Sequence, residues 1–174
     1  MIIREGRMDE LGEIAAFYDE MCRVLDSSPF LPHGNKGGYP PIAMIVRAIE
    51  RKELFVGEED GCIMAAYILS HECESAYDKV KWQIDADKTE VSILHALRVS
   101  PEYSGRGYAR KLVEHAIETA KRNKQKAMRL DCVEGNIVPQ KIYMSFGFKY
   151  IDTVGIFYDD IGVEINCRLF ELLL

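Results

Sequence analysis

The stretch of the chain best suited to chemistry is a glycine loop between a strand pattern and a helix pattern. Residues 93–99 form an apolar run typical of a strand, and Ser100-Pro101 ends it. Gly105 and Gly107 follow, and apolar residues at helical spacing begin directly after them. Glycines let a ligand approach the backbone, and the amides and dipole at a helix start attract negative charge. This order therefore predicts a site for a phosphate-bearing ligand.

Turn signals and hydrophobic periodicity predict the elements that hold this loop. Strands are expected at residues 2–5, 53–58, 62–70, 91–99, 127–133, 148–158 and 162–172, and helices at 9–25, 41–51, 137–146 and from the glycine loop to Ala120. Asp9 is expected to cap the first helix, Asp60-Gly61 to form a hairpin turn, and Asp159-Asp160 to join the last two strands. This order predicts an α/β (α+β) fold, with a mixed sheet and helices on both faces.

Length and composition indicate one globular domain covering residues 1–174. The chain is 48% hydrophobic, and its net charge of −6 argues against nucleic-acid binding. No apolar run approaches the roughly 20 residues of a membrane span, and the first residues lack a signal-peptide pattern. The five cysteines form no C-x-x-C pair and the four histidines lack metal-ligand spacing. We therefore expect a cytoplasmic protein with reduced thiols, without metal, membrane or nucleic acid.

Two other phosphate-binding motifs also contain a glycine loop between a strand and a helix. A dinucleotide site requires a third glycine, and Arg110 stands at that position, although Asp131 lies where a ribose-binding acid is expected. A P-loop requires a G-K-[ST] sequence, which does not follow the glycines. An NAD-dependent oxidoreductase is therefore an alternative that lacks part of its motif.

Four motifs, occurring in order, resemble the GNAT superfamily of acyl-CoA N-acyltransferases. They are Leu97-Arg98-Val99-Ser100-Pro101, the loop Ser104-Gly105-Arg106-Gly107-Tyr108-Ala109, Asn136, and Tyr143-Met144-Ser145-Phe146-Gly147-Phe148. The loop is similar to the family's [QR]-x-x-G-x-[GA] motif, except that Ser104 stands where Gln or Arg is usual. The resemblance implies a mostly antiparallel sheet of about seven strands, splayed between strands 4 and 5 and flanked by four helices.

The same resemblance implies acetyl-CoA (CoA) as cosubstrate and assigns residues to it. The amides of Ser104, Gly105, Arg106, Gly107, Tyr108 and Ala109 would hold the pyrophosphate, and the backbone of Leu97, Arg98 and Val99 would pair with pantetheine. Asn136 would contact the cofactor. Tyr143 would place its phenol near the sulfur and protonate the departing thiolate.

His95 is the candidate base for the amine that attacks the thioester. Strand alternation predicts that His95 and Leu97 share one face, and the local sequence is similar to arylalkylamine-type members with a histidine here. Histidine titrates near neutral pH, which suits proton removal. A buried structural histidine, water alone, or Glu90 acting through water are the alternatives.

The resemblance implies a cytosolic N-acetyltransferase that transfers acetyl directly from acetyl-CoA to a primary amine in a ternary complex. Transfer through a cysteine is the rival mechanism, and no cysteine falls within the motifs. The acceptor would be a small molecule or a peptide, and candidate residues for its side of the site are Phe30, Tyr39, Trp82, Phe157, Tyr158, Asp26, Asp159 and Asp160. A non-catalytic CoA-binding module is the alternative function, and a homodimer is a candidate assembly.

Overall fold

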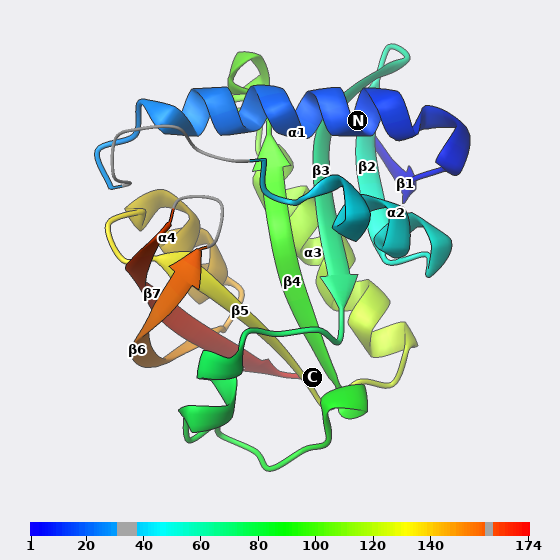
Figure 1. Ribbon diagram of the computed structural model, residues 1–174. Helices are drawn as coiled ribbons and strands as arrows, with labels where there is room; N and C mark the ends of the chain where they lie inside the picture. Colours follow the sequence, from blue (N-terminus) through cyan, green and yellow to red (C-terminus); the bar gives the residue numbers. More distant parts are fainter. Residues whose placement is uncertain (31–37, 159–161) are drawn as a thin grey trace.

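A twisted sheet with helices on both faces forms the protein (Figure 1). The computed structural model describes residues 1–30, 38–158 and 162–174. In these residues the sheet has seven strands in the order β1-β2-β3-β4-β5-β7-β6. The strands are β1 (Ile2–Glu5), β2 (Leu54–Glu59), β3 (Cys62–Ser70), β4 (Val91–Val99), β5 (Ala127–Val133), β6 (Lys149–Tyr158) and β7 (Val163–Leu173), and the helices are α1 (Leu11–Asp26), α2 (Ile42–Glu50), α3 (Tyr108–Arg122) and α4 (Ile137–Ser145). The predicted mixed, mostly antiparallel fold is confirmed.

Most of the predicted local signals act as expected. Asp60 and Gly61 have φ of 53° and 78° and connect β2 to β3, as a tight hairpin turn requires. Gly147 has a φ of 94° directly after α4, in the left-handed conformation that ends many helices. Asp9 was wrongly predicted as a helix cap, because Met8–Glu10 form a separate 3₁₀ turn before α1. The expected turn at Asp159-Asp160 lies outside the described residues.

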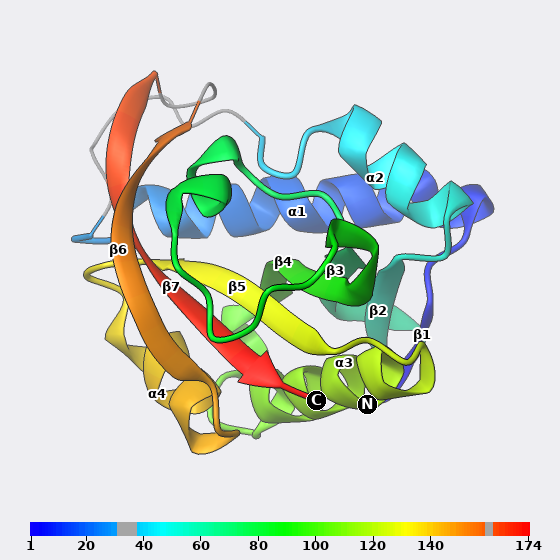
Figure 2. The same cartoon turned by 90° about the horizontal axis from the view of Figure 1, so that it is seen from below.

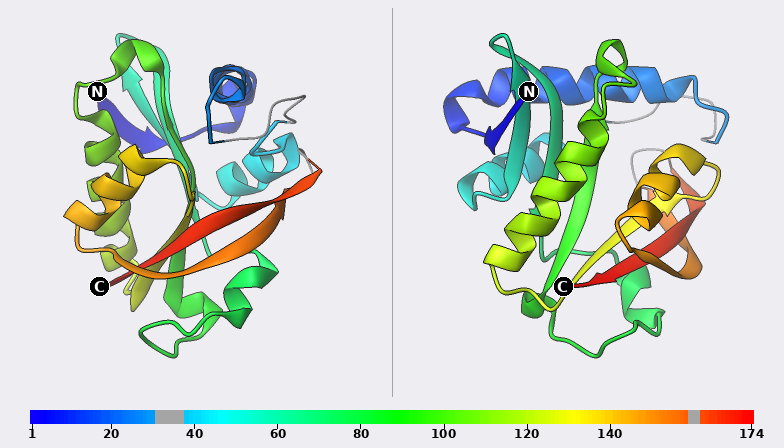
Figure 3. Two further views of the ribbon diagram at one scale, coloured as in Figure 1. Left: turned by 90° about the vertical axis from the view of Figure 1, so that its left-hand side faces the viewer. Right: turned by 180° about the vertical axis from the view of Figure 1, so that it is seen from behind.

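Two hydrophobic clusters fasten the helices to opposite faces of the sheet. α3 and α4 pack against one face through a cluster that includes Leu94, Leu112 and Tyr143. α1 and α2 cover the other face through a cluster that includes Ile14, Ile45 and Ala96. The edge-on view in Figure 3 and the view from below in Figure 2 show this three-layer arrangement. No helix in the described part of the chain has the length and apolar character needed to cross a membrane.

The sheet opens between β4 and β5. These strands are parallel, and they pair only from Val91–Ile93 to Ala127–Arg129 before they diverge, as Figure 1 shows. Ala96 has a φ of 49°, and the β3 register shifts there, so that two β4 residues lie opposite Tyr67. Such a bulge bends a strand and strengthens its local twist. The buried Tyr18 of α1 donates a hydrogen bond to the Ala96 carbonyl at 3.1 Å and holds the bulge in place.

The polar segment between β3 and β4 packs beneath β5 and β7. Glu171 of β7 is fully buried and accepts hydrogen bonds from Arg129 Nε at 2.8 Å and from the Gln83 amide at 2.7 Å. The Arg129 guanidinium lies 4.2 Å from the centre of the Trp82 ring. Trp82, expected as a candidate acceptor residue, therefore has a structural position away from the cleft described below.

Candidate active site

The glycine loop forms an open cradle at the start of α3. Gly105 and Gly107 have φ of 76° and 78°, a conformation that L side chains rarely adopt. A Cβ at either glycine would meet no heavy atom within 4 Å. The glycines are therefore required by backbone conformation, and the space above them is open to a ligand. The first amides of α3 have no partner within the helix, so they are donors for an anion.

Positive and negative side chains surround this cradle. The first turn of α3 carries no acidic residue and includes Arg110, which lies 4.7 Å from the Phe146 ring centre and donates to Ser145 Oγ. Arg106 is exposed, lies over Tyr103 and is 3.8 Å from Glu59. Glu59 also accepts from Tyr108 and pairs with the N-terminal ammonium at 3.3 Å, so its charge is offset locally. Arg106 is placed to add charge at the cradle.

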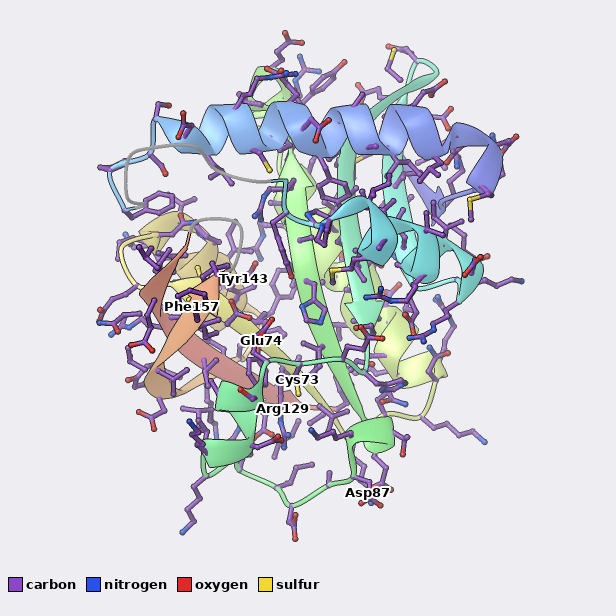
Figure 4. All side chains as sticks on the ribbon, in the orientation of Figure 1. Cys73, Glu74, Asp87, Arg129, Tyr143 and Phe157 are labelled. Carbon is purple, nitrogen blue, oxygen red and sulfur yellow. The ribbon has the colours of Figure 1, made fainter. Side chains whose placement is uncertain are left out.

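The divergence of β4 and β5 creates a cleft under the end of α1. It is lined by Cys22, Leu25, Phe30, Tyr39, Glu74, Leu94, His95, Ala96, Leu97, Arg98, Asp131, Cys132, Val133, Asn136, Pro139, Tyr143, Tyr158 and Ile165. Five of the predicted site residues therefore line one cleft: His95, Leu97, Arg98, Asn136 and Tyr143. Figure 4 shows Tyr143 and Phe157 on the β5–β7 side of the divergence, with Glu74 below them.

The backbone at the end of β4 faces the open edge of the sheet. The Ser100 amide donates to the Met64 carbonyl of β3 at 2.8 Å. Backbone groups alternate between the two neighbours along a strand, so those of Val99 point away from β3, toward the diverged β5. They are exposed strand-edge donors and acceptors of the kind that an extended ligand can pair with.

Strand alternation predicted that His95 and Leu97 share one face of the sheet, but the structure places them on opposite faces. Leu94 and Leu97 both pack toward α3, whereas Ala96 packs toward α1. The bulge at Ala96 places His95 and Ala96 on the α1 face together and reverses the alternation beyond them. The prediction was wrong because the sequence does not reveal the bulge.

The environment of His95 favours a neutral imidazole with a defined tautomer. Nε2 lies 2.7 Å from the Glu72 carbonyl, which can only accept, so Nε2 carries the proton and Nδ1 carries the lone pair. Burial lowers the pKa of His95, while the Asp131 charge acts in the opposite direction. His95 lines both this cleft and a second hollow shared with Tyr39, Glu74, Phe157 and Tyr158.

Asp131 and Glu74 are the acidic residues of the cleft that sequence reasoning did not assign to the acceptor. Asp131 of β5 accepts hydrogen bonds from Tyr77 at 2.9 Å and from Tyr158 at 3.4 Å. Glu74 is exposed at the rim. The only signal in the sequence was the position of Asp131 near the end of a strand. Phe30, Tyr39 and Tyr158 line the cleft as expected, and Phe157 lines the adjoining hollow.

Asn136 lies directly before α4 and Tyr143 lies in its last turn, and both line the cleft. Tyr143 is 7% exposed, and its hydroxyl has no hydrogen-bond partner among the described residues. Burial, with Cys132 nearby, raises the pKa of Tyr143, so the phenol stays protonated at neutral pH. Asn136 is the residue before α4, is half-buried, and its backbone is fixed by a bond to Val133.

Cys132 and Cys22 are cysteines that line the cleft although neither falls within the sequence motifs. Cys132 lies on β5 beside Asp131. Burial, with the Asp131 charge, raises the pKa of the Cys132 thiol to about 12. Since the thiolate is the nucleophile, a thiol held protonated in this way is poorly suited to covalent transfer.

Glu90 is not placed to act as a base in the cleft. Its carboxylate pairs with Lys126 Nζ at 2.6 Å and accepts from the Asp87 amide, and both contacts lower its pKa. Figure 4 shows Asp87 at the far end of β4 from Tyr143. The five residue steps from Glu90 to His95 correspond to about 17 Å of extended chain. Three other acidic residues were predicted on the acceptor side. Of these, Asp26 is the last residue of α1, and Asp159 and Asp160 lie outside the described residues.

The geometry defines a class of protein: an acyltransferase fold in which a splayed sheet edge and a glycine loop meet at one cleft. The model of the Acetyltransferase (GNAT) family matches residues 18–148. The chain belongs to this family, as the motifs predicted. An NAD-dependent oxidoreductase is therefore not supported, because only one strand pair of the described sheet is parallel.

Solved structures share this fold across the chain, and no curated protein matches. A GNAT family acetyltransferase from Streptococcus agalactiae is 23% identical with a TM-score of 0.76, covering 99% of this chain and 95% of that one. An acetyltransferase from Listeria monocytogenes is 20% identical with a TM-score of 0.75 over 99% and 94% of the chains. YncA from Salmonella typhimurium, described with its cofactor acetyl-CoA, is 17% identical with a TM-score of 0.71 over 100% and 94%.

Proposed function

We propose that the protein transfers an acetyl group from acetyl-CoA to the primary amine of a small molecule or peptide, by direct attack in a ternary complex. The cleft at the divergence of β4 and β5, with the glycine cradle at the end of β4, carries this proposal. Membership of the GNAT family supports it, as does the similar fold of a protein described with acetyl-CoA.

The residues present fit acetyl-CoA at three positions. The open cradle from Gly105 to Ala109 offers amides for the pyrophosphate, with Arg106 alongside. The Ser104 amide, which was also predicted to hold the pyrophosphate, donates instead to the Pro101 carbonyl at 2.9 Å. The Val99 backbone, which points away from β3, suits pairing with an extended pantetheine chain. Of the other two predicted contacts, the Leu97 carbonyl already accepts from the Arg98 side chain, and the Arg98 backbone faces β3. Asn136 lines the same cleft. When bound, acetyl-CoA supplies an activated thioester. The chain's own residues then orient the thioester, help to polarise its carbonyl through the strand-edge amides, and move protons.

His95 is the proposed base. An amine is protonated at neutral pH and must lose that proton before it can attack. The Nδ1 lone pair of His95 is defined by the Nε2 bond to Glu72, and burial keeps the ring neutral. His95 takes the proton directly or through water as the C–N bond forms.

Tyr143 is the proposed acid for the departing thiolate as the C–S bond breaks. We expect Tyr143→Phe to lower kcat roughly tenfold to a few hundredfold, with little change in CoA affinity. The hydroxyl has no partner among the described residues, so its removal breaks no structural bond. Steady-state kinetics with an amine panel, paired with CoA titration, measures both quantities. An unchanged kcat at every pH would show that Tyr143 is not the donor.

Ligand-dependent melting distinguishes this function from its alternatives. Acetyl-CoA should raise Tm by mass action, by the equivalent of about 2.7 kcal/mol at 100 times Kd, whereas NAD should not. Release of free thiol on adding amines then separates an enzyme from a CoA-binding module. Stabilisation by NAD without any effect of CoA would contradict the proposal, and CoA binding without transfer to any amine would favour the module.

A further inference from the structure

Arg98 contributes a cation to the cleft without an acidic partner. Its neighbours Leu97 and Val99 pack toward α3, so the Arg98 side chain lies on the α1 face of β4, the face of His95. One guanidinium nitrogen, Nη1, donates to the Leu97 carbonyl at 2.9 Å. Nε is buried without a hydrogen-bond partner, and no ion pair joins Arg98 to a carboxylate in residues 1–30, 38–158 and 162–174.

The unused part of this guanidinium has a specific geometry. With Nη1 occupied, Nε and Nη2 form a free edge with two parallel donors. Such an edge matches a carboxylate, which it binds through two charge-assisted bonds. A buried, charged donor without a partner costs free energy, so a ligand that satisfies it gains correspondingly. A planar anion in the cleft could therefore pair with an Arg98 edge that has no partner among the described residues.

The rest of the cleft has the opposite charge. Asp131 stands across from β4 on β5, and Glu74 lies at the rim, near His95. His95 and Arg98 lie opposite Ile68 and Ala66 of β3, which are two residues or about 7 Å apart along the strand. An ammonium near His95 and an anion at Arg98 can thus belong to one small molecule.

We propose that the acceptor is a small zwitterionic amino acid, whose carboxylate binds the Nε–Nη2 edge of Arg98 while its amino group lies beside His95. The inference rests on the proposed acetyl transfer and narrows its acceptor. Phe30, Tyr39 and Tyr158 line the same cleft and suit an apolar side chain on that amino acid. Polyamines and internal lysines have no carboxylate beside the reacting amine, so they leave the Arg98 edge unpaired.

Matched acceptors that differ only in the carboxylate test this inference. Leucine, methionine and phenylalanine are compared with their amides. For each acceptor, kcat/KM is calculated on the concentration of the unprotonated amine, because acids and amides differ in amine pKa. The free amino acids should be acetylated at least about 100-fold more efficiently than the amides. Arg98→Gln should lower kcat/KM for the free amino acids by about 100-fold and should change kcat/KM for the amides by no more than a few-fold. Arg23→Gln, which removes the same charge from the exposed face of α1, should leave both unchanged.

Binding of product analogues provides a readout that does not depend on turnover. N-acetyl-leucine should bind the protein–CoA complex at least tenfold more tightly than N-acetyl-leucinamide, and Arg98→Gln should abolish the difference. Retained acetyl-CoA stabilisation shows that the variant is folded.

Several outcomes would overturn the inference while leaving acetyl transfer intact. One is equal or preferred acetylation of the amides, peptides or polyamines. Another is an equal loss for acids and amides in Arg98→Gln, which would place Arg98 at the transferring group. A preference for succinyl-CoA over acetyl-CoA would assign the guanidinium to the acyl chain. Failure to bind acetyl-CoA would instead overturn the proposed function.

Discussion

Replacing His95 with glutamine should lower kcat/KM for amine acetylation by about 100-fold or more. Glutamine keeps much of the size and polarity but cannot accept a proton near neutral pH. In the wild type, kcat/KM should rise with pH through a midpoint below the ordinary histidine value of 6.5, because burial lowers the pKa of His95. The direction follows because protonated His95 is inactive as a base, so activity is lost as pH falls through the lowered pKa. The variant should lack this limb.

The amine's own ionisation produces a similar limb, so acceptors of different pKa are required. A limb that follows the amine and persists in His95→Gln would show that His95 is a structural residue. Asp131, Glu74 and Glu72 also lie around the imidazole and influence its titration. His71→Gln is the matched control, because His71 is exposed, bonds to the Val91 carbonyl and lies outside the cleft.

Placing glutamate at Gly107 should weaken CoA binding by at least about 2 kcal/mol, or roughly 30-fold. The side chain would put bulk and negative charge in the open cradle where the pyrophosphate is expected. Isothermal titration with CoA measures the loss directly, and circular dichroism checks the fold.

Two controls separate charge from backbone strain in this experiment. Gly107→Ala carries the same left-handed strain at a φ of 78° without the charge, and its Cβ meets no atom within 4 Å. Gly12→Glu adds the same charge on α1, where a Cβ also has open space. We expect both to bind CoA within a few-fold of the wild type. Unchanged affinity in a folded Gly107→Glu protein would place the phosphate site elsewhere.

Local sequence signals determined most of the fold and the cradle. The Asp60-Gly61 turn, the apolar runs of β2 and β3, and the glycines before α3 depend on residue preferences over a short stretch of chain. Their positions in the chain were therefore predictable to within one or two residues. The motifs from Leu97 to Phe148 also predicted the family, and the family match confirms it.

The tertiary structure alone decided which side chains meet in the cleft. The bulge at Ala96 depends on pairing with β3 and on Tyr18 of α1, which is 78 residues away in sequence. That single irregularity moves Leu97 to the α3 face and puts Arg98 on the α1 face with His95, whereas alternation predicted that His95 and Leu97 share a face. Asp131 and Cys132 face them because β5 diverges from β4, while Glu90 is paired with Lys126 at the other end. Sequence patterns report the local backbone, but charge and burial in a cleft depend on long-range packing between strands and helices.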